Sequence, residues 1–209
     1  MPAGLPSQPT LFERGDPAVD AAALSRLRRT RLDDHAWVEH LPDWVGGEQA
    51  LMDRLVRETA WRTERRRMYD RTVDVPRLVA SLPADGPGHP LLERIRDILS
   101  AHYRTAFARV SMGYYRNGAD SVAWHGDYVA REMDTPTLVA TVSLGAPRRF
   151  LLRPHGGGPS IAFSLGRGDL FVMGGLCQRT WQHALPKVAH ALPRLAIMFR
   201  PIWDPDRAY

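Results

Sequence analysis

The stretch Ser121-Val122-Ala123-Trp124-His125-Gly126-Asp127 decides what the C-terminal half of this chain can be. It places a histidine and an aspartate two residues apart, and alternate residues of a β-strand point to the same side. His125 and Asp127 can therefore share one metal ion. A further histidine, His183, lies downstream in the segment 180–186. Two imidazoles and one carboxylate on one face of a metal are the donor set of non-haem iron oxygenases.

The His-x-Asp pair alone is weak evidence, because the chain has eight histidines and a surface histidine beside a turn aspartate would give the same pattern. The arginines that follow His183 strengthen the metal interpretation. A keto acid that binds iron through its keto oxygen and one carboxylate needs a cation for its far carboxylate, and a guanidinium can hold a carboxylate through two hydrogen bonds. Arg194 lies on the next expected strand, and Arg200 faces the same side of it.

Short strands separated by turns surround the opening stretch. Glycine, proline or Asn-Gly breaks lie between most of them, which is typical of sandwiches and jelly rolls. The expected strands are 109–116, 121–125, 137–144, 148–153, 160–165, 169–173, 180–185 and 194–200. In a jelly roll, His125 and Asp127 would lie near one strand end and face His183 across the interior.

The N-terminal half has a different sequence pattern. Residues 1–20 contain four prolines and predict an extended arm. Apolar periodicity predicts helices over 20–34, 48–59 and, most clearly, from Pro90 to Phe107. Residues 61–68 predict a strand with four arginines, and 69–90 a loop. The expected fold class is therefore α+β: a jelly roll (double-stranded β-helix) core at about 109–201, N-terminal supporting helices and a lid segment at about 61–89, all in one domain over 21–209.

Composition limits the cellular setting. The 209 residues suffice for one sizeable core. The single cysteine, Cys177, permits no intramolecular disulfide, which fits a reducing cytosol, and we expect a cytoplasmic monomer. The first ten residues lack the basic start and apolar core of a signal peptide. No apolar run approaches the roughly 20 residues that span a bilayer, so no membrane association is expected.

The charge balance favours a polyanionic partner. The formal net charge is +5, and Lys187 is the one lysine among the 28 basic residues. Arginine forks onto phosphates and stacks on bases, which suits a nucleic acid. A GC-rich genome would also enrich arginine codons, so composition alone leaves both explanations open. Eight arginines could contact phosphates: Arg65, Arg66, Arg67, Arg71, Arg77, Arg148, Arg149 and Arg153.

In order and spacing, five segments resemble the AlkB family of iron- and 2-oxoglutarate-dependent dioxygenases. They are Tyr115–Asp120 leading to His125-Gly126-Asp127; Val142–Gly145 followed by Arg149-Phe150; Gly168–Met173; Trp181–Lys187; and Arg194 through Phe199-Arg200. Upstream, Val75-Pro76-Arg77 falls where a nucleotide-recognition lid of that family would lie.

The resemblance implies a set of roles. Fe(II) would be bound by His125, Asp127 and His183, and 2-oxoglutarate would be contacted by Tyr115, Arg194 and Arg200, with O₂ as the second cosubstrate. The implied reaction is oxidative demethylation of N-alkylated nucleobases in single-stranded or damaged DNA or RNA. A base could stack on Tyr69 or Trp124, although Trp124 could equally be a core aromatic. Arg77 and Arg149 are the other expected substrate contacts.

Three departures from the family pattern leave the substrate open. Gly113 and Ala196 stand where the family often has asparagine, and Val129 stands where its DNA-repair members commonly have an acidic residue. One alternative is the same iron chemistry on a protein side chain or a small metabolite. A second alternative is a non-catalytic jelly roll that binds nucleic acid.

Overall fold

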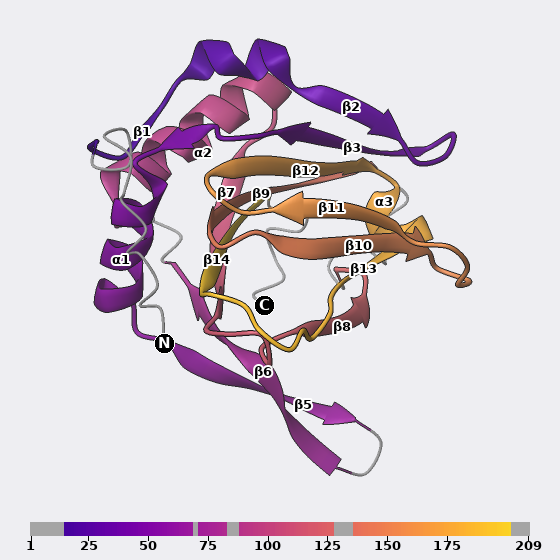
Figure 1. The fold of residues 1–209 in the computed structure, drawn as a ribbon. Helices are drawn as coiled ribbons and strands as arrows, with labels where there is room; N and C mark the ends of the chain where they lie inside the picture. Colours follow the sequence, from indigo (N-terminus) through magenta and orange to yellow (C-terminus); the bar gives the residue numbers. More distant parts are fainter. Residues whose placement is uncertain (1–14, 69–70, 83–87, 128–135, 202–209) are drawn as a thin grey trace, which may run out of the picture.

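Two antiparallel sheets face each other in the computed structural model, which describes residues 15–68, 71–82, 88–127 and 136–201 (Figure 1). The larger sheet has eight strands, in the spatial order β2 (Arg28–Arg31), β3 (Ala36–Leu41), β12 (Asp169–Gly175), β9 (Thr137–Gly145), β14 (Arg194–Pro201), β7 (Phe107–Tyr115), β6 (Arg71–Ser81) and β5 (Arg62–Met68). The smaller sheet has four strands, in the order β11 (Ile161–Leu165), β10 (Arg148–Pro154), β13 (Trp181–Leu185) and β8 (Val122–His125).

The eight strands from β7 to β14 form the jelly roll. Four of them, β7, β9, β12 and β14, lie in the larger sheet, and the other four make the smaller one. This confirms the predicted fold class, and each of the eight expected strands is present with ends shifted by at most two residues. Local alternation and turn residues are enough to mark such strands, because each is short and bounded by glycine or proline.

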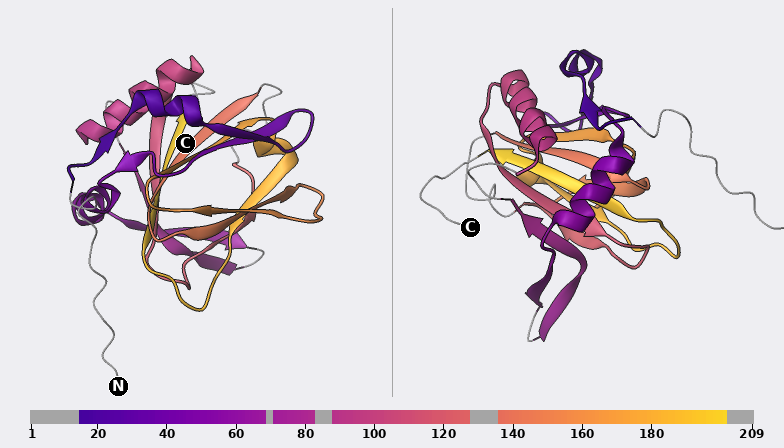
Figure 2. Two further views of the ribbon diagram at one scale, coloured as in Figure 1. Left: turned by 45° about the horizontal axis from the view of Figure 1, so that its top comes forward. Right: turned by 90° about the vertical axis from the view of Figure 1, so that its left-hand side faces the viewer.

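Two helices cover the outer face of the larger sheet (Figure 2). They are α1 (Glu48–Glu58) and α2 (Pro90–Tyr103). Their apolar stripes pack on the residues of β9 and β14 that point away from the smaller sheet, such as Val142 and Ile197. Because neighbouring residues of a strand point to opposite faces, Arg194, Ala196 and Met198 point between the sheets, where they line a cavity.

The two predicted helices 48–59 and 90–107 are present, but the second is shorter than expected. Pro90 begins α2, and the His89 ring accepts a hydrogen bond from the backbone N–H of Leu91 at 3.3 Å. Arg104 adopts a left-handed conformation with φ 52°, which ends the helix. Phe107 then begins β7. Among the described residues, no helix is long and apolar enough to cross a membrane.

The predicted helix over 20–34 is wrong. A short 3-10 helix, η2 (Ala21–Arg26), begins after Asp20, whose carboxylate accepts from the N–H of Ala22 at 2.9 Å. The next residues form β2, which pairs with β3 and extends the larger sheet. Pairing with a neighbouring strand overrides the helix propensity of this Ala-, Leu- and Arg-rich stretch, and propensity is only a weak guide to structure. The sequence did not predict β2 or β3 as strands.

The predicted loop over 69–90 is also wrong in its first half. Residues 71–81 form β6, which pairs with β5 on one side and β7 on the other. Pro76 lies where the register with β5 is irregular, between the pairs Thr63↔Leu78 and Arg65↔Asp74. Proline lacks a ladder N–H and is tolerated at such irregularities. The predicted lid is thus largely a hairpin that projects from the sheet (Figure 1).

The predicted N-terminal arm falls mostly outside the described residues, since residues 1–14 are not among them. Ala18–Val19 form β1, which pairs with β4 (Val45–Gly46). The remaining described helix, α3 (Cys177–Thr180), lies just before β13.

Candidate metal centre and its cavity

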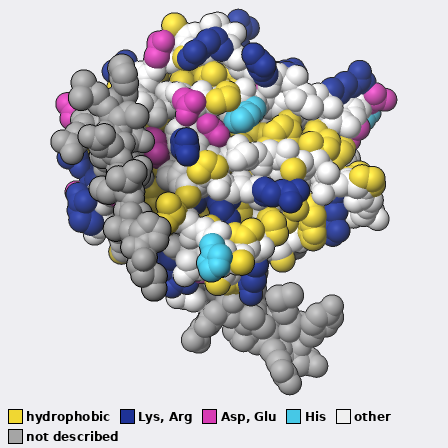
Figure 3. Space-filling model, in the orientation of Figure 1, with side chains coloured by type: hydrophobic (Ala, Val, Ile, Leu, Met, Phe, Trp, Pro, Cys, Tyr) yellow, Lys and Arg dark blue, Asp and Glu magenta, His cyan; other side chains and the backbone are white. Residues whose placement is uncertain are grey.

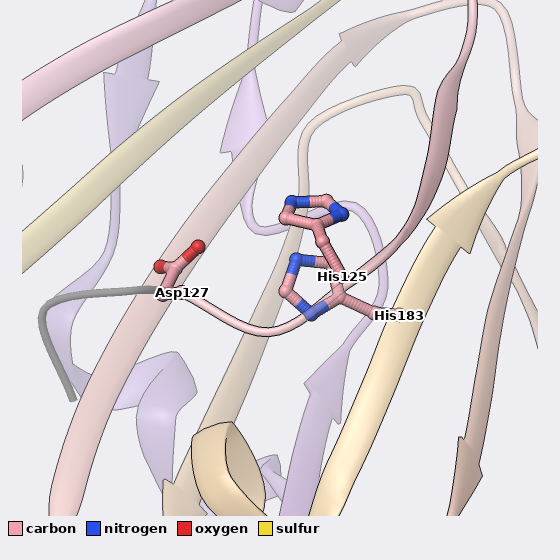
Figure 4. Close-up of side chains that lie close together, drawn as sticks. All are labelled: His125, Asp127 and His183. Carbon is pink, nitrogen blue, oxygen red and sulfur yellow. The ribbon is translucent and has the colours of Figure 1, made fainter. Parts of the chain in front are cut away.

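The two histidines and the aspartate singled out in the sequence lie together between the sheets. One ligand atom from each of His125, Asp127 and His183 can be chosen so that all lie within 4.8 Å of one another. In Figure 4 the carboxylate of Asp127 faces the two imidazoles. His125 ends β8 and lies directly opposite His183 of β13 in the sheet register. Residues 58 positions apart in the chain therefore meet through one strand pair.

A β-bulge shapes the strand that carries the first histidine. The pairs Val122↔Leu185 and His125↔His183 have a register shift between them, because three residue steps of β8 oppose two of β13. Bulges re-aim side chains and are common beside active sites. Here the bulge allows Val122 and His125 both to line the cavity although they are an odd number of residues apart.

Hydrogen bonding and packing orient both imidazoles. Nδ1 of His125 lies 2.8 Å from the carbonyl oxygen of Ala123. A neutral imidazole donates from Nδ1 to this carbonyl, which makes Nε2 the basic nitrogen that can bind a metal. The ring of His183 stacks on Phe150, with centroids 5.4 Å apart and planes inclined by 25°.

The ionisation of the site suits a metal. Burial raises the pKa of the Asp127 carboxyl, but Arg200 and the two histidines outweigh this and hold that pKa below its usual range. Burial, aided by the neighbouring His125, lowers the pKa of His183 to about 3. The site thus offers a carboxylate and a neutral imidazole, the protonation states in which these groups bind metals. These donors fit Fe(II) in a 2-His-1-carboxylate site.

Arg200 is bound to the carboxylate of the triad. Its Nε donates to Oδ2 of Asp127 at 2.8 Å, and its Nη1 donates to Oγ of Ser111 at 2.7 Å. The two side chains of the ion pair are only 18% and 12% exposed. Sequence reasoning expected Arg200 to contact the cosubstrate; the structure places its guanidinium on the metal side of the cavity, where it orients Asp127.

Arg194 occupies another part of the cavity wall and is buried. Its Nε donates to the carbonyl of Leu165 at 3.1 Å, and its Nη2 donates to Oγ of Ser143 at 2.7 Å. Burial lowers the pKa of this guanidinium to about 10, so it remains charged at neutral pH. The Arg194 Cζ atom lies 5.5 Å from the ring centroid of Tyr115, its partner across the strand pair.

A cavity of about 560 Å³ joins these groups. Its lining includes seven of the ten residues that the sequence nominated: Arg77, Tyr115, His125, Asp127, His183, Arg194 and Arg200. Two others, Trp124 and Arg149, lie outside this lining. Trp124 is not part of the lining, and its ring instead lies under the guanidinium of Arg153 at 4.2 Å. Arg149 is exposed and precedes the cavity residue Phe150, so it faces the other side of β10.

The sequence connected three further residues with the substrate. Tyr69 and Val129 lie outside the described residues. Arg148, one of the possible phosphate contacts, is buried and donates to the carbonyls of Asn117, Asp120 and Pro186. It holds two loops together, because a guanidinium can satisfy several carbonyls at once.

Several residues of the site had no signal of their own in the sequence. Ser111 and Ser143 accept hydrogen bonds from the two cavity arginines. Gln178 accepts a hydrogen bond from the backbone N–H of Asp127 at 3.1 Å. A β-carbon at Gly126 would lie 2.7 Å from the carbonyl oxygen of Gln178, so the residue between the two ligands has no room for a side chain. Gly126 and Ser143 lie in segments that carried the resemblance, and this was the signal that could have found them.

Comparison with known proteins agrees with this geometry. The family model of the 2OG-Fe(II) oxygenase superfamily matches residues 54–200. The alpha-ketoglutarate-dependent dioxygenase alkB homolog 3 of Bos taurus is 28% identical over 198 residues, covering 80% of this chain and 67% of that protein. The DNA oxidative demethylase ALKBH2 of Homo sapiens is 34% identical over 125 residues, covering 56% of this chain and 48% of that protein. The chain thus spans about two thirds and about half of their lengths.

Two solved structures share the fold. OsALKBH1 superposes with a TM-score of 0.58 at 14% identity and covers 83% of this chain and 100% of that one. A prolyl hydroxylase from Trichoplax adhaerens, in complex with a hypoxia inducible factor peptide fragment, gives a TM-score of 0.60 at 8% identity, with coverages of 78% and 83%.

The family match includes all three metal-donor residues, which confirms the predicted Fe(II), 2-oxoglutarate and O₂ as cofactor and cosubstrates. The chain belongs to the AlkB family of iron(II)- and 2-oxoglutarate-dependent dioxygenases.

Proposed function

We propose that this enzyme removes alkyl groups from N-alkylated nucleobases of DNA or RNA by oxidation, with His125, Asp127 and His183 as the iron ligands. The observation that carries the proposal is the position of the cavity. Its wall includes Arg77 and Val79 of β6, the strand that continues into the arginine-rich hairpin. A base that enters from this side would reach the donor triad while its phosphates stay near the hairpin.

The chemistry follows from the cofactor and the substrate. With Fe(II) bound by the triad, 2-oxoglutarate and O₂ would supply the two-electron oxidation that converts an N-methyl C–H bond into C–OH, and 2-oxoglutarate would leave as succinate and CO₂. The N-hydroxymethyl base then loses formaldehyde, and the unmodified base is restored. The protein contributes position and exclusion of water, which the apolar lining residues Val122, Phe150 and Leu185 provide around the triad.

The polar side chains have separate tasks in this proposal. Arg194 binds the far carboxylate of 2-oxoglutarate, since its charge is buried and fixed by Leu165 and Ser143. Tyr115, its cross-strand neighbour, donates its phenolic O–H to the same cosubstrate. Arg200 keeps the Asp127 carboxylate in one orientation and in its charged form.

The relatives and the charge support a nucleic acid as substrate. One relative is named a DNA oxidative demethylase, and the chain carries a formal net charge of +5. Figure 3 shows Lys and Arg side chains spread over the visible face rather than gathered in one patch. A base in a duplex would have to be flipped into the cavity, which favours single-stranded or damaged substrates.

A second candidate is the same chemistry on a peptide or a small metabolite. The departure at Val129 from the acidic residue of DNA-repair members favours it. No observation favours the non-catalytic alternative, because the donor triad, Arg194 and Arg200 are all present in the cavity.

A turnover screen tests the proposal. The purified protein, loaded with Fe(II), is given methylated oligonucleotides, methylated peptides and small metabolites, and succinate and formaldehyde are measured. We expect formaldehyde in step with succinate for methylated oligonucleotides only, and for an inactive Asp127→Ala protein neither product. Coupled turnover on a peptide or metabolite, with none on any oligonucleotide, would establish the second candidate instead.

A further inference from the structure

Three strands of the larger sheet present a row of polar side chains to the cavity. Arg194 of β14 is the register partner of Tyr115 of β7. On the other side of β7, Val79 of β6 pairs with Gly113, and Leu78 pairs with Tyr114. Strands β6 and β7 are antiparallel, so Arg77, one position further, lies beside Tyr115. Its Nη1 donates a hydrogen bond to the Tyr115 hydroxyl at 3.2 Å.

Tyr115 therefore lies between two guanidinium groups. Arg77 binds its hydroxyl, and the Arg194 Cζ atom lies 5.5 Å from its ring centroid. The ring itself is buried, at 4% exposure. All three side chains line the same cavity. Two cations on either side of one phenol make this end of the cavity attractive to an anion.

The neighbouring cross-strand pair has small side chains, which leaves space for the Arg77 side chain beside Tyr115. Gly113 and Ala196 are direct register partners. A β-carbon at Gly113 would lie 3.6 Å from Cε2 and 3.7 Å from the hydroxyl oxygen of Tyr115, and 3.9 Å from Cδ of Arg77. These are ordinary contacts for one methyl group, but any longer side chain would extend into the space between the guanidinium stem and the phenol. The glycine thus permits the Arg77–Tyr115 contact.

We propose that Arg77 is a positioning residue for 2-oxoglutarate, which acts through Tyr115. The phenolic oxygen accepts a hydrogen bond from Arg77, and its own proton is then directed toward a different acceptor. The cosubstrate carboxylate held by Arg194 is that acceptor. Arg77 was expected from the sequence to contact the nucleic acid; this inference assigns it to the cosubstrate, and it rests on the proposed roles of Tyr115 and Arg194.

The assignment links two parts of the fold. Arg77 belongs to β6, and β6 continues into the hairpin formed with β5. A change that displaces β6 would therefore alter 2-oxoglutarate affinity even when the metal donors remain in place.

The test measures cosubstrate binding directly. The Mn(II)-loaded protein, which binds without turning over, is titrated with 2-oxoglutarate by isothermal titration calorimetry. Arg77→Ala should weaken binding about tenfold, because the Tyr115 O–H is no longer directed toward the cosubstrate carboxylate and its hydrogen bond to that charged group is lost. Arg77→Lys should recover part of it, since lysine keeps the charge but lacks the fork. Arg94→Ala, an exposed arginine of α2, is the matched control and should bind normally.

A double-mutant cycle shows whether Arg77 acts through Tyr115. In a Tyr115→Phe background, Arg77→Ala should have little further effect on 2-oxoglutarate binding. An equal loss in both backgrounds would overturn the inference. If Arg77→Ala melts at a lower temperature than wild type, Arg77→Met, which keeps the packed stem, takes its place in the cycle.

The outcomes for the two arginines separate this inference from the proposed function. If Arg194→Ala loses affinity for 2-oxoglutarate and Arg77→Ala binds as wild type does, the role of Arg77 is wrong and the cosubstrate site stands. If neither variant loses affinity, the assignment of the cosubstrate site itself is wrong.

Discussion

Arg200 and Asp127 form an ion pair, Nε to Oδ2 at 2.8 Å, inside the cavity of a jelly roll. The second hydrogen bond of the guanidinium, to Ser111, comes from the neighbouring strand β7. An aspartate held in this way keeps one oxygen directed by the protein and stays charged, which prepares it to bind a cation before the cation arrives.

We therefore expect Arg200→Ala to weaken iron binding by about 10- to 100-fold, the usual effect of removing a partner of a metal ligand. Arg200→Lys should recover part of the affinity, because the charge remains but the fork is lost. Equilibrium dialysis with Fe(II) under anaerobic conditions measures it. Unchanged affinity in Arg200→Ala would show that the ion pair does not prepare Asp127.

His183→Ala should remove most Fe(II)-dependent 2-oxoglutarate turnover, because two donors do not complete the site. The fold should persist, since the substitution removes one side chain and leaves the backbone pairing within both sheets intact. Succinate formation measures the turnover, and circular dichroism of the same preparation measures whether the fold persists. Wild-type turnover in a purified, folded His183→Ala protein would refute the ligand assignment.

Arg194→Ala should raise the 2-oxoglutarate concentration needed for half-maximal turnover by roughly 10- to 100-fold, which corresponds to the loss of a charge-assisted hydrogen bond of about 1.5–3 kcal/mol. Affinity for an oligonucleotide should change far less. Steady-state succinate formation at varied cosubstrate concentration gives the first number, and fluorescence titration gives the second. Equal losses in cosubstrate and oligonucleotide binding would indicate that Arg194 stabilises the fold as a whole rather than binding the cosubstrate.

Gly126→Ala should impair iron binding although residue 126 has no donor atom. A β-carbon there would lie 2.7 Å from the Gln178 carbonyl, so the loop between His125 and Asp127 must shift, and overpacking of this kind costs about 1–3 kcal/mol. Gly156→Ala is the control, because nothing lies within 4 Å of its β-carbon. Thermal melting and Fe(II) binding of both variants are compared; identical behaviour of the two would show that the loop accommodates the methyl group.

A nucleic-acid substrate predicts binding that weakens steeply with salt, since phosphate contacts release counterions. Replacement of Arg65, Arg66 and Arg67 on β5 by serine should flatten the salt dependence by up to about three contacts and leave 2-oxoglutarate turnover without substrate nearly unchanged. A fluorescent methylated single strand, titrated at two salt concentrations, gives the slopes. No binding at low salt would end the nucleic-acid proposal.

The sequence predicted the roll from local signals, and it singled out His125, Asp127 and His183, which the structure brings together. The strands are short and bounded by turn residues, and the histidines and the aspartate are the residue types that bind iron. It failed where distant pairing decides. The stretch 28–31 became a strand because β3 was available beside it, and Pro76 is accommodated at a register irregularity that only the sheet reveals.

The roles of individual side chains also depend on contacts between distant parts of the chain. Arg200 pairs with Asp127, and Arg148 joins two loops rather than contacting a partner. Both roles depend on distances between segments far apart in the chain. Nothing in the local sequence distinguishes Arg148 from the exposed Arg149. The monomeric state and the cytoplasmic location remain predictions.

The carbonyl of Pro76 accepts a hydrogen bond at 2.7 Å from the backbone N–H of Ser121, the residue just before β8. The base of the hairpin is thereby fastened to the segment that leads to His125. A displacement of the hairpin base would therefore be transmitted to the strand that carries His125. In such a molecule, a change at the base of the hairpin and a change at the donor triad are not independent events.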